Sequence, residues 1–334
     1  MTVNIVLAVL LAAAFTGSLL IGRLDIGAGR IIEMAVNYFI GRPSAGGLHA
    51  MEIVFFQVRL PRCLMAVLVG AGLAVSGAVY QGLFRNPLIS PDILGVSSGC
   101  TFGAALGFIL PLSSFMLVHG LSFAFGLLAV GMSVMLARAI SIKPVIVLVL
   151  SGMVVLSFFN ALLMAVKYFS DPYDELPSII FWVMGSLTRV SWDNIAVMAP
   201  VALSGIILFT ALGFRLNVLS LGDIQAKSLG TNPKIFRRAM ILVSSLIVAG
   251  AVATCGQISW VGLVVPHMAR TLAGPEHENM LPVTALLGAI FLLLADTAAR
   301  SISAAEIPVG IITALVGAPV FGLIMYKNRR TGWL

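Results

Sequence analysis

Charge is scarce in this sequence: only 10% of its 334 residues are charged, whereas 60% are hydrophobic. An ordinary soluble domain has about a quarter of its residues charged, because its core must be covered by a polar surface. So few charges cannot cover a chain of this length. A soluble globular protein is therefore excluded, and the lipid bilayer must be the main solvent of the chain.

Cysteine and histidine are also scarce, and their spacing excludes most site chemistry. The three cysteines form no CxxC pair, so we expect buried packing residues rather than a disulfide framework. The four histidines are scattered without the spacing of metal ligands. We expect no metal site and no catalytic residue, which disfavours a membrane-embedded enzyme. These residues are Cys63, Cys100, Cys255, His49, His119, His267 and His277.

A nucleotide-binding loop is absent as well, because GxxxxGK[ST] does not occur and Gly-Lys is never found as a dipeptide. We therefore expect no ATP site and no cofactor in this chain. Most ionisable residues fall at the ends of apolar runs, which argues against a proton relay and so against an ion-coupled secondary transporter, the main alternative class. The net charge of +7 does not indicate a nucleic-acid partner, because basic residues mark cytoplasmic loops in membrane chains.

What the sequence does contain is a series of apolar runs, each near the roughly 20 residues that cross a bilayer as a helix. They lack the alternating polar face of barrel strands, so they predict an all-α, polytopic membrane protein with about ten transmembrane helices. The first run lacks the basic start of a signal peptide and is expected to be retained. The eighth and ninth runs are short. The predicted spans are 5–21, 64–83, 93–110, 115–136, 145–166, 195–212, 239–255, 258–272, 281–295 and 307–325.

Basic residues gather in alternate gaps between these runs, which predicts that those gaps and both termini are cytoplasmic. The polar connections are too short for a soluble domain, so residues 1–334 are expected to form one transmembrane domain in the cytoplasmic (inner) membrane. Within the connection after the fifth span, residues 176–187 predict a short interfacial helix. A shift of 179 residues pairs a few glycines and prolines and suggests an inverted repeat. The basic residues are Arg85, Arg138, Lys143, Arg215, Lys227, Lys234, Arg237, Arg238, Lys327, Arg329 and Arg330; the pairs are Gly77 with Gly256, Pro87 with Pro266 and Gly95 with Gly274.

Three arginines lie at the external ends of predicted spans: Arg59 and Arg62 before the second span and Arg300 after the ninth. Position alone favours snorkelling to lipid headgroups, although guanidinium groups also suit carboxylates of a partner. Asp296 lies one helical turn before Arg300 and predicts a structural ion pair. Glu306 is expected to cap or brace the last span.

The cytoplasmic loop of about residues 221–231 is unusually ordered for a linker. Ser220 or Gly222 can begin a short helix and Gly230 can end it, while the topology exposes its apolar residues. This pattern predicts a helix that docks on a cytoplasmic partner. A second irregular segment, from Asn86 to Leu88, breaks the helix after the second span and is either a plain turn or part of a pathway.

Several long motifs resemble one family in the family's order from about Arg59 to the C-terminus. They are RLPR, GAGLAVSGAVYQGLFRNPLISPDILGVSSG, SLGDIQAKSLG, GQISWVGLVVPHMARTLAGPEH and ADTAARSISAAEIPVGIITALVGAPVF. This set resembles the FecCD-type permeases for iron–siderophore, haem and cobalamin uptake, the transmembrane subunits of type II ABC importers.

The resemblance implies a homodimer with ten spans per subunit, two cytoplasmic ATPase subunits that hold ATP and Mg²⁺, and an external binding protein that delivers a metal chelate. It implies that Arg59, Arg62 and Arg300 dock the binding protein, and that residues 86–88 lie at a cytoplasmic gate. An iron–siderophore complex is the first expectation for the cargo; haem, cobalamin or an oxyanion such as molybdate stay open. The implied ATPase-coupling residues are Leu221, Gly222, Asp223, Ala226, Leu229 and Gly230; those of the gate are Asn86, Pro87 and Leu88.

Overall fold

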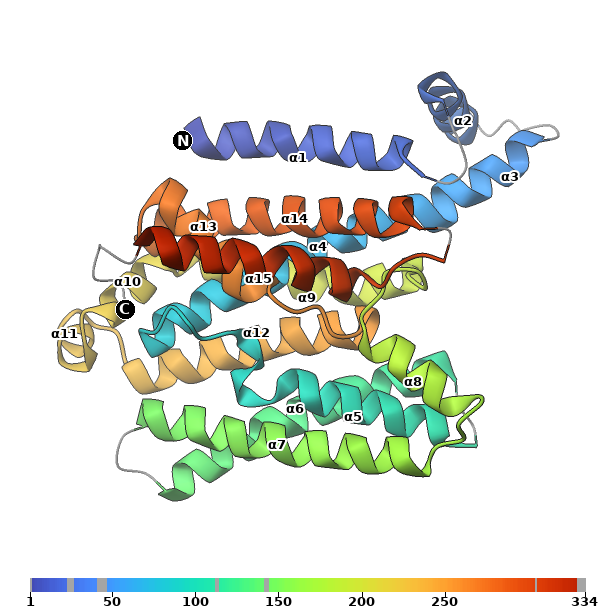
Figure 1. Ribbon diagram of the computed structural model, residues 1–334. Helices are drawn as coiled ribbons and strands as arrows, with labels where there is room; N and C mark the ends of the chain where they lie inside the picture. Colours follow the sequence, from blue (N-terminus) through green and yellow to red (C-terminus); the bar gives the residue numbers. More distant parts are fainter. Residues whose placement is uncertain are drawn as a thin grey trace.

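The computed structural model describes residues 2–22, 27–40, 47–111, 114–140, 144–303 and 305–328. Every regular element in these residues is helical, and the long helices run along one common direction (Figure 1). The elements are α1 (Thr2–Leu20), α2 (Ala28–Ile40), α3 (Gly47–Ile53), the π-helix η1 (Val54–Arg59), α4 (Leu60–Phe84), the 3₁₀ helix η2 (Pro91–Leu94), α5 (Val96–Ile109), α6 (Phe115–Ile140), α7 (Pro144–Phe169), α8 (Glu175–Val183), α9 (Trp192–Ala211), α10 (Gly213–Ser220), α11 (Asp223–Ser228), α12 (Pro233–Cys255), α13 (Val261–Ala273), α14 (His277–Ile302) and α15 (Val309–Asn328).

Eight of the described helices are long and apolar enough to cross a membrane. Each of the ten predicted spans coincides with a helix, but α5 has 14 residues and α13 has 13. At 1.5 Å per residue these two helices are about 20 Å long, shorter than the hydrocarbon core of about 30 Å. Both are preceded by irregular backbone, which therefore lies at membrane depth and must be buried in protein.

The expectation of a short ninth span is wrong, because α14 has 26 residues. Its first turn holds His277 and Glu278 and its last turns hold Asp296 and Arg300, and all four lie outside or at the edge of the apolar run. Hydropathy alone therefore placed the boundaries too far inside the helix. The polar residues at both ends of α14 have hydrogen-bonding or ionic partners in other parts of the protein.

The connection between the first two spans contains helices that hydropathy did not predict. Helices α2 and α3 lie in it, and the chain continues from α3 through η1 into α4 without a break. The second span thus belongs to a helical run of 35 residues, Ala50–Phe84. Pro61 falls in the first turn of α4, where its missing N–H interrupts the regular bonding pattern. The Leu60 N–H bonds to the Phe55 carbonyl, five residues back, as in a π-helix.

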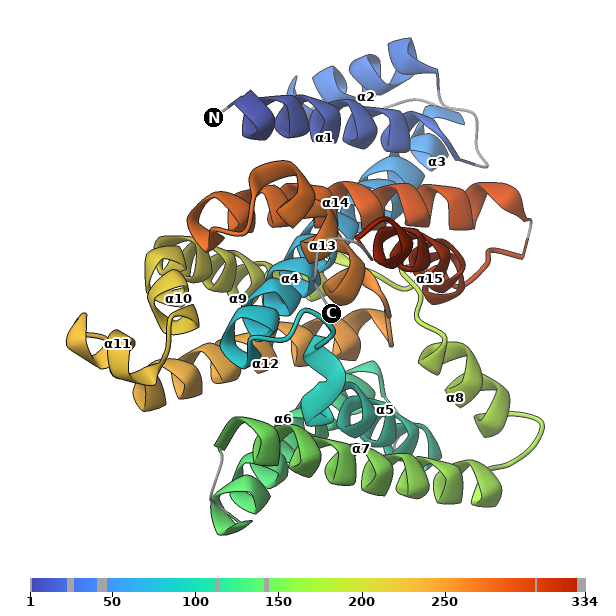
Figure 2. The same cartoon turned by 60° about the vertical axis from the view of Figure 1, so that its left-hand side comes forward.

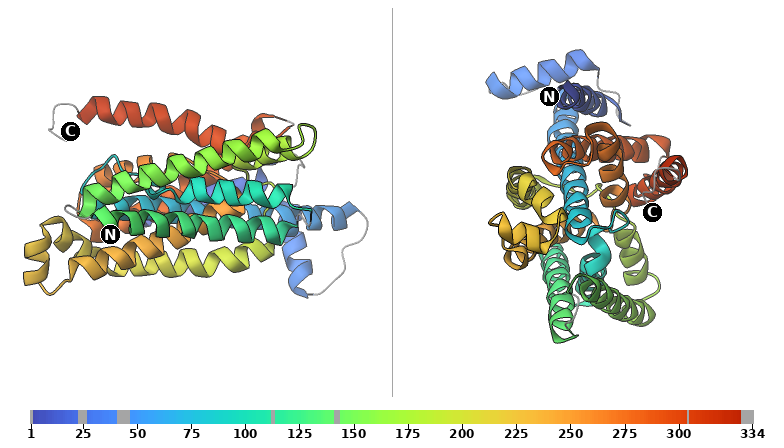
Figure 3. Two further views of the ribbon diagram at one scale, coloured as in Figure 1. Left: turned by 90° about the horizontal axis from the view of Figure 1, so that it is seen from below. Right: turned by 90° about the vertical axis from the view of Figure 1, so that its left-hand side faces the viewer.

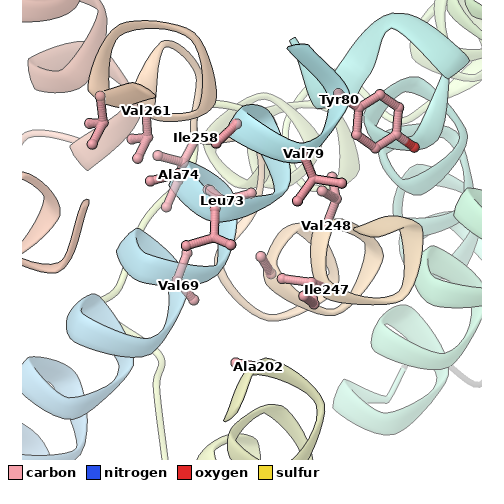
Figure 4. Close-up of a cluster of buried hydrophobic side chains, with 14 of the residues drawn as sticks. Val69, Leu73, Ala74, Val79, Tyr80, Ala202, Ile247, Val248, Ile258 and Val261 are labelled. Carbon is pink, nitrogen blue, oxygen red and sulfur yellow. The ribbon is translucent and has the colours of Figure 1, made fainter. Parts of the chain in front are cut away.

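Helix α4 forms the centre of the bundle. Seen along the helix axes, it is surrounded by α9, α12, α13 and α14 (Figure 3, right), and nearly every side chain from its second turn onward is buried. Its apolar residues pack with those of α9, α12 and α13, as the close-up shows for Val69, Leu73, Ala202, Ile247 and Val261 (Figure 4). The core of the protein is therefore built around one helix rather than between two layers.

Glycines allow the neighbours of α4 to approach closely. A side chain at Gly70 would collide with the backbone carbonyl of Gly288 on α14, and one at Gly77 would collide with the carbonyl of Gly262 on α13. Small residues at helix crossings are the usual means by which membrane helices gain packing contacts. The glycines of α4 thus set its distances to α13 and α14.

The predicted shift of 179 residues does not align the helices of the two halves. Gly256 directly follows α12 whereas Gly77 lies inside α4, so that shift does not align the helices. Glycine and proline are common in this chain, and the loops of the two halves differ in length. What repeats is the series of helix lengths, 25, 14, 26 and 26 residues in α4–α7 and 23, 13, 26 and 20 in α12–α15. Helices α4 and α12 begin at opposite ends of the bundle (Figure 1).

The two ends of the bundle differ. Helix α1 begins and α15 ends at the end that carries α10 and α11, the α11 end; α2, α3 and α8 lie at the other, the α8 end (Figures 1 and 2). The short helix predicted at 176–187 is α8, which stops at Val183. Of the basic residues used to predict the orientation, Lys143, Arg329 and Arg330 lie outside the described residues.

Candidate functional site

The three arginines predicted for docking come together at the α8 end of the bundle. Arg59 ends η1, Arg62 follows it in the first turn of α4, and Arg300 lies in the last turn of α14. They are buried, with 4% to 6% of each residue exposed. The snorkelling interpretation is therefore wrong for this cluster, because snorkelling places the charged head in water.

Asp296 and Glu306 neutralise Arg62 from two sides. The Arg62 Nε donates to Asp296 Oδ1 at 2.9 Å and to Oδ2 at 3.0 Å, and its Nη2 lies 2.9 Å from Asp296 Oδ1. The Nη1 of the same guanidinium donates to Glu306 Oε2 at 2.9 Å. This fork geometry is the strong form of an ion pair. The predicted pair of Asp296 with Arg300 is looser, with Arg300 Nε 3.8 Å from Oδ2.

The end of α1 covers the other two arginines. Arg59 Nη1 donates to the Leu19 carbonyl at 3.0 Å, and a side chain at Gly22 would collide with the Arg59 guanidinium. Arg300 Nη2 donates to the carbonyl and the hydroxyl of Ser18. Sequence reasoning missed these contacts because the partners are about 40 and 280 residues apart, and no local pattern marks them. The described contacts thus give Arg62 and Arg300 one shared carboxylate, Asp296, and give Arg62 a second one, Glu306.

At the α11 end, the predicted docking helix is present as α11, with Gly222 as its N-cap and Gly230 just after it. Both glycines have positive φ, 132° and 78°, a region that side chains disfavour. Ala226 is fully buried against the bundle. Leu221, Ile224 and Leu229 point away from it and are exposed, with Ile224 79% exposed. An exposed apolar surface on an ordered helix is typical of a protein contact.

Asp223 fastens α11 to the bundle. Arg237, on α12, donates to both of its carboxylate oxygens, at 2.9 Å and 2.6 Å, and Arg85 Nη2 lies 3.5 Å from Oδ1. Hydrogen bonds from Arg237 hold the pKa of the Asp223 carboxyl below its ordinary value, and the nearby positive charges act in the same direction. Sequence reasoning named Asp223 but not the two arginines as its partners. Their only signal was that basic residues gather in this region.

The predicted gate residues form the turn between α4 and η2, and this turn contacts α13. Asn86 accepts a hydrogen bond from the Leu88 N–H at 2.9 Å through its side-chain oxygen, a local turn that breaks the helix. His267 Nε2 lies 2.9 Å from the Pro87 carbonyl oxygen. Arg85, just before the turn, donates to the Leu219 carbonyl of α10 at 2.7 Å. The turn therefore contacts both the segment that leads to α11 and a short membrane helix.

A cleft of about 500 Å³ lies at the α8 end, between α5, α6, α8 and the end of α12. The described residues of its walls include four aromatic side chains, several hydroxyl groups, His119 and Arg189, and none of them is acidic. Among the described residues no group of three or more His, Cys, Asp or Glu side chains could hold a metal ion. The aromatic residues are Phe108, Phe115, Phe181 and Trp182.

These features define a multi-pass helical membrane protein, with an ionic cluster at one end and an exposed helix at the other. Residues 10–327 match the FecCD transport family, and the chain belongs to this family, whose members are permeases of ABC importers.

Known relatives cover most of the chain. It is 44% identical over 281 residues to the molybdate import system permease protein of Haemophilus influenzae, covering 84% of this chain and 82% of the relative. It is 39% identical over 283 residues to an iron chelatin transport system permease protein of Helicobacter pylori, covering 84% and 85%. A solved structure of a metal-chelate type ABC transporter in an inward-facing conformation is similar, with a TM-score of 0.86, 40% identity, and coverage of 98% of this chain and 99% of that one. The fold expected from the motifs is therefore confirmed.

Proposed function

We propose that this chain is the membrane subunit through which an ATP-driven importer moves a metal chelate into the cytoplasm, with an iron–siderophore complex as the cargo. The observation that carries the proposal is α11. It is fastened to the bundle by Asp223 and Ala226 while Ile224 stays exposed. A helix held in this way can transmit a push from a second protein to the membrane helices.

The second protein is an ATPase subunit, and two copies bind ATP and Mg²⁺ outside this chain, which itself needs no cofactor. We assign the contact with the ATPase to the exposed residues of α11. The shape of this helix is assigned to the buried residue Ala226 and to the two flanking glycines, Gly222 and Gly230. ATP-driven closure of the ATPases would press on α11, and Arg85 would pass the movement to the gate turn. The coupling residues are Leu221, Gly222, Asp223, Ala226, Leu229 and Gly230; the gate residues are Asn86, Pro87 and Leu88.

An external binding protein would deliver the cargo at the α8 end, where the guanidinium groups of the arginine cluster suit acidic groups. Arg59, Arg62 and Arg300 are the docking residues in this proposal. The α11 end then faces the cytoplasm, and both termini lie there. The whole chain acts as one transmembrane domain.

A second copy of the chain would complete the pathway. Helices α7 and α15 leave apolar side chains exposed along their length, among them Leu150, Val154, Leu315 and Leu323. Lipid can cover part of this surface, and we assign the rest to a homodimer. Cargo would then move between the two subunits and be released rather than held tightly.

One observation favours a second cargo: the relative with 44% identity is named for molybdate. Haem and cobalamin are further cargo classes that the same architecture could carry. The FecCD family consists of permeases of ABC importers, and this membership argues against an ion-coupled secondary transporter.

The test is cargo-stimulated ATP hydrolysis and uptake in liposomes that contain this chain and its ATPase. Binding proteins loaded with iron–siderophore, molybdate, haem or cobalamin are added in turn. We expect one loaded protein to stimulate both activities, and the Arg59→Glu and Asp223→Arg variants to lose them. Lys167→Glu, at the same end as Arg59 but outside the cluster, is the control and should keep them. Uptake driven by an ion gradient without the ATPase would refute the proposal.

A further inference from the structure

Glu306 differs from the other carboxylate of the arginine cluster in its exposure. Its side chain is 24% exposed, whereas that of Asp296 is fully buried. Asp296 binds the Nε and Nη2 side of Arg62, and Glu306 binds Nη1. Only the Glu306 side of this guanidinium is therefore near solvent. A carboxylate that arrives from outside would meet Arg62 at the position that Glu306 now occupies.

The backbone at Glu306 is strained. Its φ is 47°, in the left-handed region that a non-glycine residue adopts at a cost. The residue lies in the connection between α14 and α15, three residues before α15 begins. An ion pair that holds a strained connection can release it when the pair is exchanged.

We propose that Glu306 is an internal substitute for a docking carboxylate, and that a partner's acidic group binds Arg62 by displacing it. This inference rests on the docking role proposed above. The exchange replaces one carboxylate with another, so neither Arg62 nor Asp296 is left as a buried unpaired charge, which would be costly. Glu306 is thus a positioning residue, and its displacement would transmit the docking of a partner to the rest of the chain.

Displacement of Glu306 can affect α15, because the first turn of this helix and the connection that contains Glu306 are hydrogen-bonded to neighbouring segments. The Ile307 N–H donates to the Ala299 carbonyl on α14 at 3.2 Å, and the Gly310 N–H donates to the Gly185 carbonyl at 3.4 Å. Gly310 also packs on the Met184 carbonyl, so the start of α15 rests on the segment after α8. Displacement of Glu306 would loosen these two bonds and free the start of α15 to move.

The sign of the effect follows from the charge count. Removing the charge of Glu306 makes the net charge of the cluster more positive by one unit and removes the internal competitor. The Glu306→Gln variant should therefore bind an acidic partner more tightly, by about tenfold at low salt. Glu306→Asp keeps the charge and should bind as the wild type does. Glu175→Gln, on α8 at the same end of the bundle, is the matched control and should leave binding unchanged.

The experiment uses the full complex with its ATPase in nanodiscs and a fluorescein-labelled hexaglutamate peptide as the probe. Peptide affinity is measured for the variants and for Arg62→Gln across a series of salt concentrations. Hydrogen exchange at the amides of Ile307 and Gly310 is followed in the wild type with and without peptide. We expect the affinity gain of Glu306→Gln, its loss in high salt, and faster exchange at both amides when the peptide is bound. A purely structural role of Glu306 would not produce this peptide-dependent exchange.

The outcomes separate this inference from the docking proposal. If the wild type binds the peptide through Arg62, but Glu306→Gln binds within twofold of it and exchange does not change, the displacement is refuted while docking stands. If the wild type and Arg62→Gln do not differ in binding, docking at Arg62 fails and the inference fails with it. Thermal unfolding of each variant shows whether a loss of binding reflects a loss of fold.

Discussion

Asp296 is the residue on which the arginine cluster depends most, and its replacement by asparagine gives the sharpest stability prediction. The carboxylate is fully buried and is contacted by Arg62 at 2.9 Å and 3.0 Å and by Arg300 at 3.8 Å. Asparagine keeps the shape but removes the negative charge. Two buried guanidinium groups then lose their shared counter-ion, while Arg62 keeps its bond to Glu306.

The magnitude follows from what a broken buried pair costs. Removing one partner of such a pair typically costs about 3–5 kcal/mol, because the remaining charge is desolvated and unpaired. Asp296→Asn should therefore lower the unfolding free energy by about 3 kcal/mol or more. Asp223→Asn is the comparison, since its carboxylate is half exposed and exposed pairs contribute about 1 kcal/mol or less.

The assay is reversible unfolding in mixed detergent, followed by circular dichroism, with both variants and the wild type measured in parallel. The double variant Asp296→Asn with Arg300→Met should recover part of the loss, because Arg62 keeps its bond to Glu306 and the cation that lost its carboxylate is then gone. If Asp296→Asn unfolds within about 1 kcal/mol of the wild type, the cluster does not hold α4 and α14 together and the reasoning is refuted.

Three further predictions test other parts of the structure. Gly70→Val should sharply reduce the yield of folded protein and its melting temperature, because a side chain there collides with the α14 backbone. Gly120→Val is the control and should change neither, because a side chain there meets nothing within 4 Å. An unchanged melting temperature of Gly70→Val would contradict the close crossing of α4 and α14. Ile224→Glu should leave the melting temperature within about 1 °C of the wild type, since this side chain is exposed and lies outside the hydrophobic core. The same variant should weaken binding of the ATPase at least tenfold in a pull-down titration. Full ATPase binding would count against α11 as the contact. The Asp223 carboxyl has a lowered pKa, so its pairing with Arg237 should contribute fully above the ordinary carboxyl value of about 3.9 and be lost only as the pH falls through the lower folded value. The protection of the α11 amides, which is their exchange rate relative to the intrinsic rate at each pH, should then be constant from pH 8 to pH 5. A transition in protection inside that range would contradict the pairing.

Much of the fold could be predicted from the sequence because the bilayer imposes simple rules. Apolar runs of about 20 residues identify spanning helices, and all ten predicted runs coincide with helices. Hydropathy failed where polar residues belong to a helix, as at both ends of α14, and where amphipathic helices lie outside the apolar runs, as in α2. Those limits arise because tertiary contacts satisfy the polar groups, and such contacts have no local pattern.

Of the two candidate sites, one could be predicted from local sequence and the burial of the other could not. The helix α11 was predictable, because its flanking glycines and exposed apolar residues are local in sequence. The burial of Arg59, Arg62 and Arg300 was not, because it depends on the end of α1 and on Glu306, which are distant along the chain. Position at the end of a span alone predicted snorkelling to lipid headgroups. Only the packing of the helices shows the internal partners of these arginines.

The two half-length helices have a consequence for how the chain is inserted during synthesis. At about 20 Å, α5 and α13 are too short to leave the insertion machinery as independent spans. Each is followed closely by a 26-residue helix, α6 and α14 respectively, and α5 packs along most of α6 (Figure 3, left). Each short helix must therefore enter the membrane as one arm of a hairpin with its longer successor. The irregular segment before α5 packs mainly against α7, and Ser133 of α6 donates to the Leu94 carbonyl within it. This segment therefore gains its protein cover only once the two long helices that follow α5 have entered the membrane.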